Sequence, residues 1–124
     1  MKEPFEPIFA RLKSVLGSYS PPMKAVSDSA KRYDLYTTKE VEMFGRKYPS
    51  LYFAGIKLQK GSVGFYYFPL YMYPEMLADI PPELKKLLKG KTCFHIKKYD
   101  EEIFRQVEKV MKEGLKCYTK KNFI

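Results

Sequence analysis

Two strand-like runs separated by a two-residue turn constrain the fold of this chain more than any other feature. Residues 51–59 and 62–68 are rich in aromatic and β-branched side chains, which favour extended structure. Lys60 and Gly61 stand between them and suit the positive backbone angles of a tight hairpin turn. The pattern predicts an antiparallel hairpin that ends at Pro69, because proline has no amide hydrogen to donate within a central strand.

A helix is predicted near each end of the chain, because apolar residues recur there at three- and four-residue spacing. The first spans about 4–16 and is followed by Gly17, a residue typical of helix ends. The last starts after Asp100, a candidate N-cap, and runs to about Tyr118. The expected apolar stripes are Phe5, Ile8, Phe9, Leu12, Val15 and Leu16 in the first helix, and Ile103, Phe104, Val107, Val110, Met111 and Leu115 in the last.

The remaining segments give weaker patterns. Residues 33–38 are expected to form a strand, followed by a short helical turn that ends near Gly45, whereas 23–32 has no clear pattern. Helical turns are predicted to start at Pro74 and at 81–82, the second ending at Gly90. Residues 91–97 alternate as a strand, with Thr92, Phe94 and Ile96 on one face and Cys93, His95 and Lys97 on the other.

This order of elements predicts an α+β fold: a mostly antiparallel sheet with the terminal helices packed on one face, and the other face partly open. At 124 residues and 45% hydrophobic content, we expect a single domain spanning 1–124 with a core that needs no disulfide or metal. The two cysteines are expected to be reduced thiols. The sequence shows no signal peptide and no membrane span, so we expect a cytoplasmic protein.

Four motifs carry a family resemblance. They are YFAGIKL at 52–58, FPLY at 68–71, IPPELKK at 80–86 and GKTCF at 90–94. Together they resemble the YdhG-like family of domains of unknown function, and the likeness extends over about residues 5–118. The resemblance implies a frataxin-type α+β sandwich, and some members carry an iron-chaperone label by that fold analogy alone. Here His95 and Ile96 replace the Asn and Phe common in the family.

The residues favour neither metal binding nor catalysis. Iron chaperoning needs clustered carboxylates, whereas this chain has a net charge of +9. Cys93 and His95 share a strand face, but with a single histidine in the chain the ligands for a structural zinc site are too few. The chain has neither a nucleophile elbow nor a complete phosphate-binding glycine loop. We therefore expect no catalytic residue, metal or cofactor, and an enzyme that uses Cys93 is only the third alternative, after the two binding roles below.

A binding role is the leading prediction. An open sheet face with tyrosines and lysines suits an anionic or aromatic small ligand or an acidic protein. The candidate ligand-binding residues are Lys57, Tyr66, Lys91, His95 and Lys97. The same aromatic residues suit the core or a dimer contact, so both a monomer and a homodimer remain open.

Nucleic-acid binding through the last helix is the alternative. Its basic stripe consists of Arg105, Lys109, Lys112 and Lys116. Glu101 and Glu108 precede two of these cations by four residues, which is the spacing of ordinary helix-stabilising pairs. The stripe therefore predicts either a phosphate-binding ridge or a solvated helix face.

Overall fold

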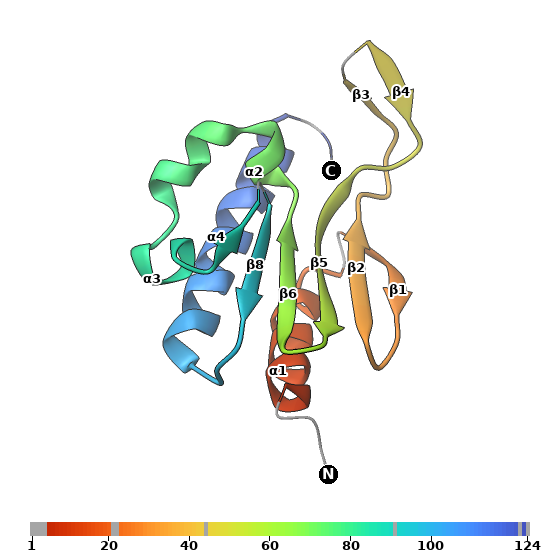
Figure 1. Ribbon diagram of the computed structural model, residues 1–124. Helices are drawn as coiled ribbons and strands as arrows, with labels where there is room; N and C mark the ends of the chain where they lie inside the picture. Colours follow the sequence, from red (N-terminus) through yellow and green to blue (C-terminus); the bar gives the residue numbers. More distant parts are fainter. Residues whose placement is uncertain (1–4, 21–22, 44, 91, 122, 124) are drawn as a thin grey trace.

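A six-stranded antiparallel sheet with two helices on one face forms the body of the protein (Figure 1). The computed structural model describes residues 5–20, 23–43, 45–90, 92–121 and 123. The strand order is β1 (Lys24–Asp28), β2 (Arg32–Tyr36), β5 (Tyr52–Gln59), β6 (Ser62–Tyr67), β8 (Cys93–Ile96) and β7 (Leu88–Lys89). Both α1 (Glu6–Gly17) and α4 (Glu101–Lys120) lie behind the sheet in Figure 1. The α+β class and the placement of the terminal helices are as predicted from the sequence.

The central hairpin is confirmed. Gln59 pairs with Ser62, which leaves Lys60 and Gly61 as the two-residue turn between β5 and β6. Gly61 has φ +88°, a left-handed conformation that a residue with a side chain rarely adopts. Beyond β6, Pro69 starts the short helix α2 (Pro69–Met72). The strand therefore ends before Pro69, as predicted from the lack of an amide hydrogen in proline.

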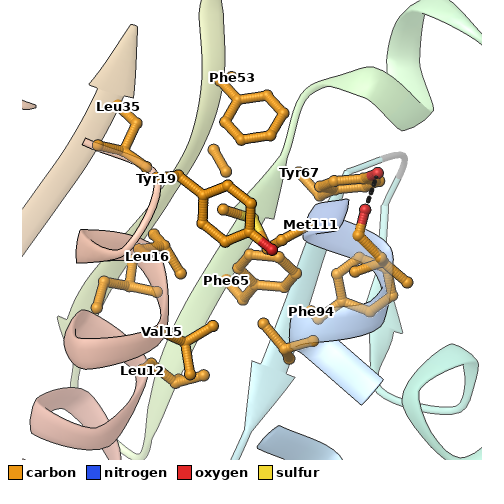
Figure 2. Packing of buried hydrophobic residues seen from close by; sticks show 14 of the residues in the cluster. Leu12, Val15, Leu16, Tyr19, Leu35, Phe53, Phe65, Tyr67, Phe94 and Met111 are labelled. Atoms are coloured by element: carbon orange, nitrogen blue, oxygen red, sulfur yellow. Dashed lines mark hydrogen bonds between the residues drawn. The ribbon is translucent and has the colours of Figure 1, made fainter. Parts of the chain in front are cut away.

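The helix stripes bury the sheet face as expected. Figure 2 shows Leu12 and Leu16 of α1 and Met111 of α4 in the same buried cluster as Phe65 of β6. The alternation in β8 is also confirmed, because Phe94 and Ile96 are buried in this core, whereas Cys93 and His95 are half-buried on the other face. Asp100 caps α4, since its carboxylate accepts a hydrogen bond of 3.0 Å from the amide of Glu102.

Three buried tyrosines donate their hydroxyls to backbone carbonyls: two join the sheet to α4, and Tyr19 joins the turn after α1 to α4. Tyr67 donates to Val110 (Figure 2). Tyr118 donates to Tyr52 over 2.7 Å, and Tyr19 donates to Glu108 over 3.4 Å. Burial raises the pKa of all three hydroxyls, and the pKa of Tyr19 rises from 10.0 to about 12, with a smaller contribution from the nearby Glu108 carboxylate.

These buried hydroxyls predict a loss of stability at alkaline pH. In the unfolded chain Tyr19 loses its proton near its ordinary pKa of 10.0, whereas the folded protein retains it to about 12. The unfolded state therefore binds fewer protons in this window, and the free energy of unfolding falls as pH rises through it. Urea unfolding at about pH 9, 10 and 11 measures the loss, and Tyr19→Phe is expected to make the pH dependence shallower. An unchanged slope in Tyr19→Phe would contradict the contribution of this residue.

The expected helical turn before Gly45 is wrong. The segment instead forms a second hairpin, β3 (Val41–Met43) with β4 (Arg46–Tyr48), which projects from the body at the upper right of Figure 1. Gly45 has φ +72° and belongs to the hairpin turn instead of a helix end. The unassigned segment before β2 forms β1, an edge strand whose register shifts between Ala25 and Ser27, which obscures the alternation in the sequence.

The excursion between β6 and β8 is less helical than predicted. A 3-10 helix, η1 (Pro74–Asp79), precedes α3 (Pro82–Lys85), which ends well before Gly90. The next residues form β7, where Leu88 pairs with Phe94 and Lys89 with Cys93. Gly90, at φ +80°, lies in the connection between the two strands. The pairing with β8 therefore overrides the helical propensity of the lysine- and leucine-rich segment.

Within the described segments, no helix is both long enough and apolar enough to cross a bilayer.

Candidate functional site

The sheet face opposite the helices, here called the outer face, carries two rows of side chains that run across the strands. One row contains Asp34, Gly55, Tyr66 and Cys93, which are paired in turn from β2 to β8. The second row, here called the cation row, contains Arg32, Lys57, Gly64 and His95. Each row has one glycine in a central strand, and neighbouring side chains occupy the space that a side chain there would take.

Gly55 makes room for a buried carboxylate. A Cβ at this position would overlap both the Asp34 carboxylate and the Tyr52 hydroxyl. Asp34 Oδ1 accepts a hydrogen bond of 3.0 Å from Tyr52, and its Oδ2 accepts one of 2.5 Å from Arg32 Nε. The Asp34 side chain is only 5% exposed, whereas that of Arg32 is 58% exposed. The buried charge is therefore paired and hydrogen-bonded, as a stable buried charge must be.

The environment of Tyr52 keeps its hydroxyl protonated. Burial raises its pKa most, and the adjacent Asp34 carboxylate raises it further. A protonated Tyr52 remains a hydrogen-bond donor to Asp34 over the physiological pH range. Tyr52 and Asp34 therefore form a fixed support for the guanidinium of Arg32.

Gly55→Ala is expected to destabilise the protein by about 1 to 2 kcal/mol, because the new methyl group displaces Asp34 and Tyr52. The loss stays moderate since both side chains lie on the outer face and can move toward solvent. Urea unfolding measures the effect. Gly61→Ala provides a control in which no neighbour lies within 4 Å of the added carbon and only the positive φ is penalised. Full retention of stability in Gly55→Ala would contradict the tight packing of Asp34 and Tyr52.

A second polar cluster covers Gly64. Gln59 lies over this glycine, donates from Nε2 to the Tyr66 hydroxyl over 2.8 Å, and accepts from Ser62 over 3.2 Å. Cys93 lies opposite Tyr66, and its pKa is raised by burial, partly offset by a hydrogen bond with Tyr66. A nucleophilic cysteine needs a lowered pKa, so the environment of Cys93 does not favour a reactive thiolate.

The hollow between these clusters, here called the outer-face hollow, has a volume of about 270 Å³. It is lined by Arg32, Asp34, Tyr36, Tyr52, Lys57 and Tyr66. The rings of Tyr36 and Tyr52 lie with their centroids 5.1 Å apart. Among the described residues, Lys57 has no carboxylate within 4 Å. The hollow therefore combines two cationic groups and one carboxylate with three tyrosines.

The predicted ligand-binding residues do not all meet in this hollow. Lys57 and Tyr66 line it. His95 continues the cation row but lines a different hollow together with Lys97. Lys91 lies outside the described residues.

Four residues of the outer-face hollow were missed in the sequence. Arg32, Asp34 and Tyr36 alternate along β2 and therefore share the outer face. This alternation was a usable signal, but the strand was expected to begin at Tyr33. Tyr52 joins them through the pairing of β2 with β5, which the pattern of one strand does not reveal.

The basic stripe of α4 is largely balanced by acidic neighbours. Lys112 pairs with Glu108 over 3.9 Å, as the four-residue spacing predicts, and Lys116 pairs with Glu113 over 3.7 Å. The expected pairing of Arg105 with Glu101 is wrong.

Arg105 instead bonds Glu102 over 2.6 Å, because Glu101 is engaged by Arg11 of α1 over 3.2 Å. Lys109 lines a small hollow on the helix surface together with Glu102. The stripe therefore has the character of a solvated helix face.

Neither cysteine forms a disulfide, and both are half-buried. Over the described part of the chain, no group of three or more His, Cys, Asp or Glu side chains is placed to hold a metal ion.

No family model, curated protein or solved structure matches this chain.

Proposed function

We propose that this protein is a binding protein that holds a small anionic ligand with an aromatic ring in the outer-face hollow. The observation that carries the proposal is the position of Arg32 directly opposite Lys57 on adjacent strands. Like charges in this position destabilise a sheet, and an anion bound between them would remove the repulsion. Asp34 only partly offsets it, because its carboxylate is buried against Arg32 while Lys57 remains without an acidic partner among the described residues.

The lining residues suggest a division of roles. Arg32 and Lys57 are placed to share a carboxylate or phosphate, with the planar guanidinium suited to two hydrogen bonds. Tyr36 and Tyr66 are half-exposed at the same hollow and offer ring surface to an aromatic group. Asp34 and Tyr52 act as positioning residues, since they hold Arg32 without needing contact with the ligand.

Nucleic-acid binding through α4 has less support. Arg105, Lys112 and Lys116 each lie within 4 Å of a carboxylate on the same helix, so the ridge carries little unbalanced charge. A ligand held in the outer-face hollow is expected to lose affinity mildly as salt rises. Nucleic-acid binding would fall steeply with salt, because it releases condensed counterions.

The test is a calorimetric titration and thermal-shift comparison with phenyl phosphate and benzoate, using inorganic phosphate and acetate as ring-free controls. The ring-bearing anions are expected to bind more tightly. Lys57→Ala and Tyr66→Ala should weaken binding, whereas Lys112→Ala removes an equal charge from α4 and should not. Affinities that are indifferent to both Lys57→Ala and Tyr66→Ala would overturn the proposal.

We also propose that the chain is a cytoplasmic member of the YdhG-like, frataxin-type group. The sequence motifs support this assignment, and so does the presence of one helix before the sheet and one after it. An experimental structure of a YdhG-like protein tests it: a strand order different from β1-β2-β5-β6-β8-β7 would contradict the assignment. Fractionation of cells that express the protein tests the location.

A further inference from the structure

The positive charge of this chain is concentrated in one short segment. Residues 85–98 contain six lysines and no acidic residue. The whole chain has a net charge of +9, so the remaining residues together carry only +3. A solvated surface that serves only solubility usually mixes the two signs, so this concentration calls for a more specific explanation.

The fold brings both ends of this segment to a second hollow, here called the edge hollow. The amide of His95 donates to the carbonyl of Leu87 over 2.9 Å, which holds the β7 side of the segment against β8. The edge hollow has a volume of about 390 Å³ and lies at this end of the sheet. Four lysines line it, two from each side of the pairing: Lys86, Lys89, Lys97 and Lys98.

The walls of the edge hollow are partly apolar. Leu87 and Ile96 line it beside the lysines, and Ile103 contributes from the first turn of α4. Ile96 is 1% exposed and Ile103 is 7% exposed, so these residues belong to the packed core. Charges beside such a low-dielectric wall interact more strongly with a ligand than they would in open water.

The lysines of the edge hollow lack acidic partners. Elsewhere among the residues that the structure describes, six cations lie within 4 Å of a carboxylate, on α1, β2 and α4. Within the described segments, none of the four hollow lysines has such a partner. Asp100 is the one carboxylate among the described lining residues, and it caps α4 through the amide of Glu102.

We propose that the edge hollow is a second binding site, separate from the outer-face hollow, for a small ligand that carries a triphosphate group. Four lysines against one carboxylate give the lining a charge of +3, which matches a multiply charged anion and not a monoanion. Lysine binds phosphate as a point charge without a fixed geometry, and this suits a flexible chain of phosphates. The described lining residues of the two hollows are all different, so either site can exist without the other.

The test is calorimetric titration with tripolyphosphate, ATP, pyrophosphate and orthophosphate, at a constant ionic strength of about 0.15 M, where charges beyond about 8 Å are screened. Affinity is expected to rise with the number of phosphates. ATP binding as tightly as tripolyphosphate identifies the triphosphate group as the recognised element. ATP binding more tightly shows that the apolar wall also contacts the nucleoside. Both results support the site, and they distinguish a free polyphosphate from a nucleotide ligand.

Two double variants of equal charge separate the site from general attraction. Lys89→Ala with Lys97→Ala is expected to weaken tripolyphosphate binding at least about tenfold, because two charge-assisted contacts are lost. Lys112→Ala with Lys116→Ala should leave it unchanged. All four lysines are exposed, and thermal melting checks that both variants fold. Lys57→Ala should have no effect, so this test is independent of the proposed aromatic ligand.

Three outcomes would overturn the proposal. The first is that wild type shows no saturable binding of tripolyphosphate. The second is an equal loss in both double variants, which indicates nonspecific attraction to a basic protein. The third is that a single-stranded oligonucleotide binds more tightly than tripolyphosphate and is equally sensitive to both double variants, which indicates an extended nucleic-acid surface.

Discussion

Replacing Phe104 with alanine is expected to lower the free energy of unfolding by about 3 to 5 kcal/mol. Phe104 is 1% exposed and belongs to the buried core where α4 meets α1. Its ring meets Tyr99 edge to face at 5.0 Å, and the guanidinium of Arg11 lies 5.7 Å from its centroid. The substitution therefore removes a large buried side chain together with its aromatic and cation–π contacts. Urea unfolding monitored by circular dichroism measures the loss.

Tyr99→Ala is the comparison for this variant. Tyr99 contacts the same ring but is 55% exposed, so its removal leaves no closed cavity. We expect a loss of about 0.5 to 1.5 kcal/mol, the usual value of one aromatic pair. If Phe104→Ala lowers the free energy of unfolding by less than about 1 kcal/mol, the assignment of the apolar stripe of α4 to the core would be wrong.

The parts of the fold that could be predicted are those in which the local pattern agrees with the tertiary environment. The stripe of α4 has helical spacing, and its apolar members are buried except Leu115, which is half-buried. The hairpin of β5 and β6 has extended-favouring residues on both sides of Gly61, which adopts the positive φ that the turn requires. In both cases local preference and packing select the same structure.

The prediction was wrong where tertiary pairing decides the structure. β7 is only two residues long and forms because Leu88 and Lys89 find partners on β8. Strands β3 and β4 are three residues each, too short for a clear alternation. Gly45 correctly indicated where the chain turns. A glycine after a polar segment is, however, as typical of a helix end as of a hairpin turn.

The candidate site was predictable only in part, for a related reason. Lys57 and Tyr66 follow from alternation within one hairpin, whose register is set by its turn. Asp34 and Tyr52 meet only because β2 pairs with β5 through a register shift next to Tyr36. That shift comes from the three-dimensional packing and leaves no periodic signal in the sequence, so the buried carboxylate beside Arg32 was not expected.

Gly114→Ala is the second substitution with a large expected effect. It is expected to destabilise the protein, whereas the same substitution stabilises an exposed helix. In an exposed helix interior, alanine is more favourable than glycine by about 1 kcal/mol. Here an added Cβ would lie 2.5 Å from the Tyr67 hydroxyl and 3.1 Å from the rings of Phe53 and Tyr67. Both aromatic residues are fully buried, so neither can move toward solvent. We expect a net loss of about 2 to 3 kcal/mol in urea unfolding, because overpacking exceeds the gain in helix propensity.

A double-mutant cycle with Tyr67→Phe shows whether the hydroxyl is the cause. Tyr67→Phe alone is expected to cost about 1 kcal/mol, because the hydrogen bond to the Val110 carbonyl is lost. Without the hydroxyl, the methyl group that Gly114→Ala adds loses its closest contact, so the double variant should be more stable than the sum of the two losses predicts by about 1 kcal/mol or more. If the two losses of stability are additive, the added methyl group clashes with the rings of Phe53 and Tyr67 and not with the hydroxyl. A Gly114→Ala protein more stable than wild type would show that α4 does not lie this close to β6.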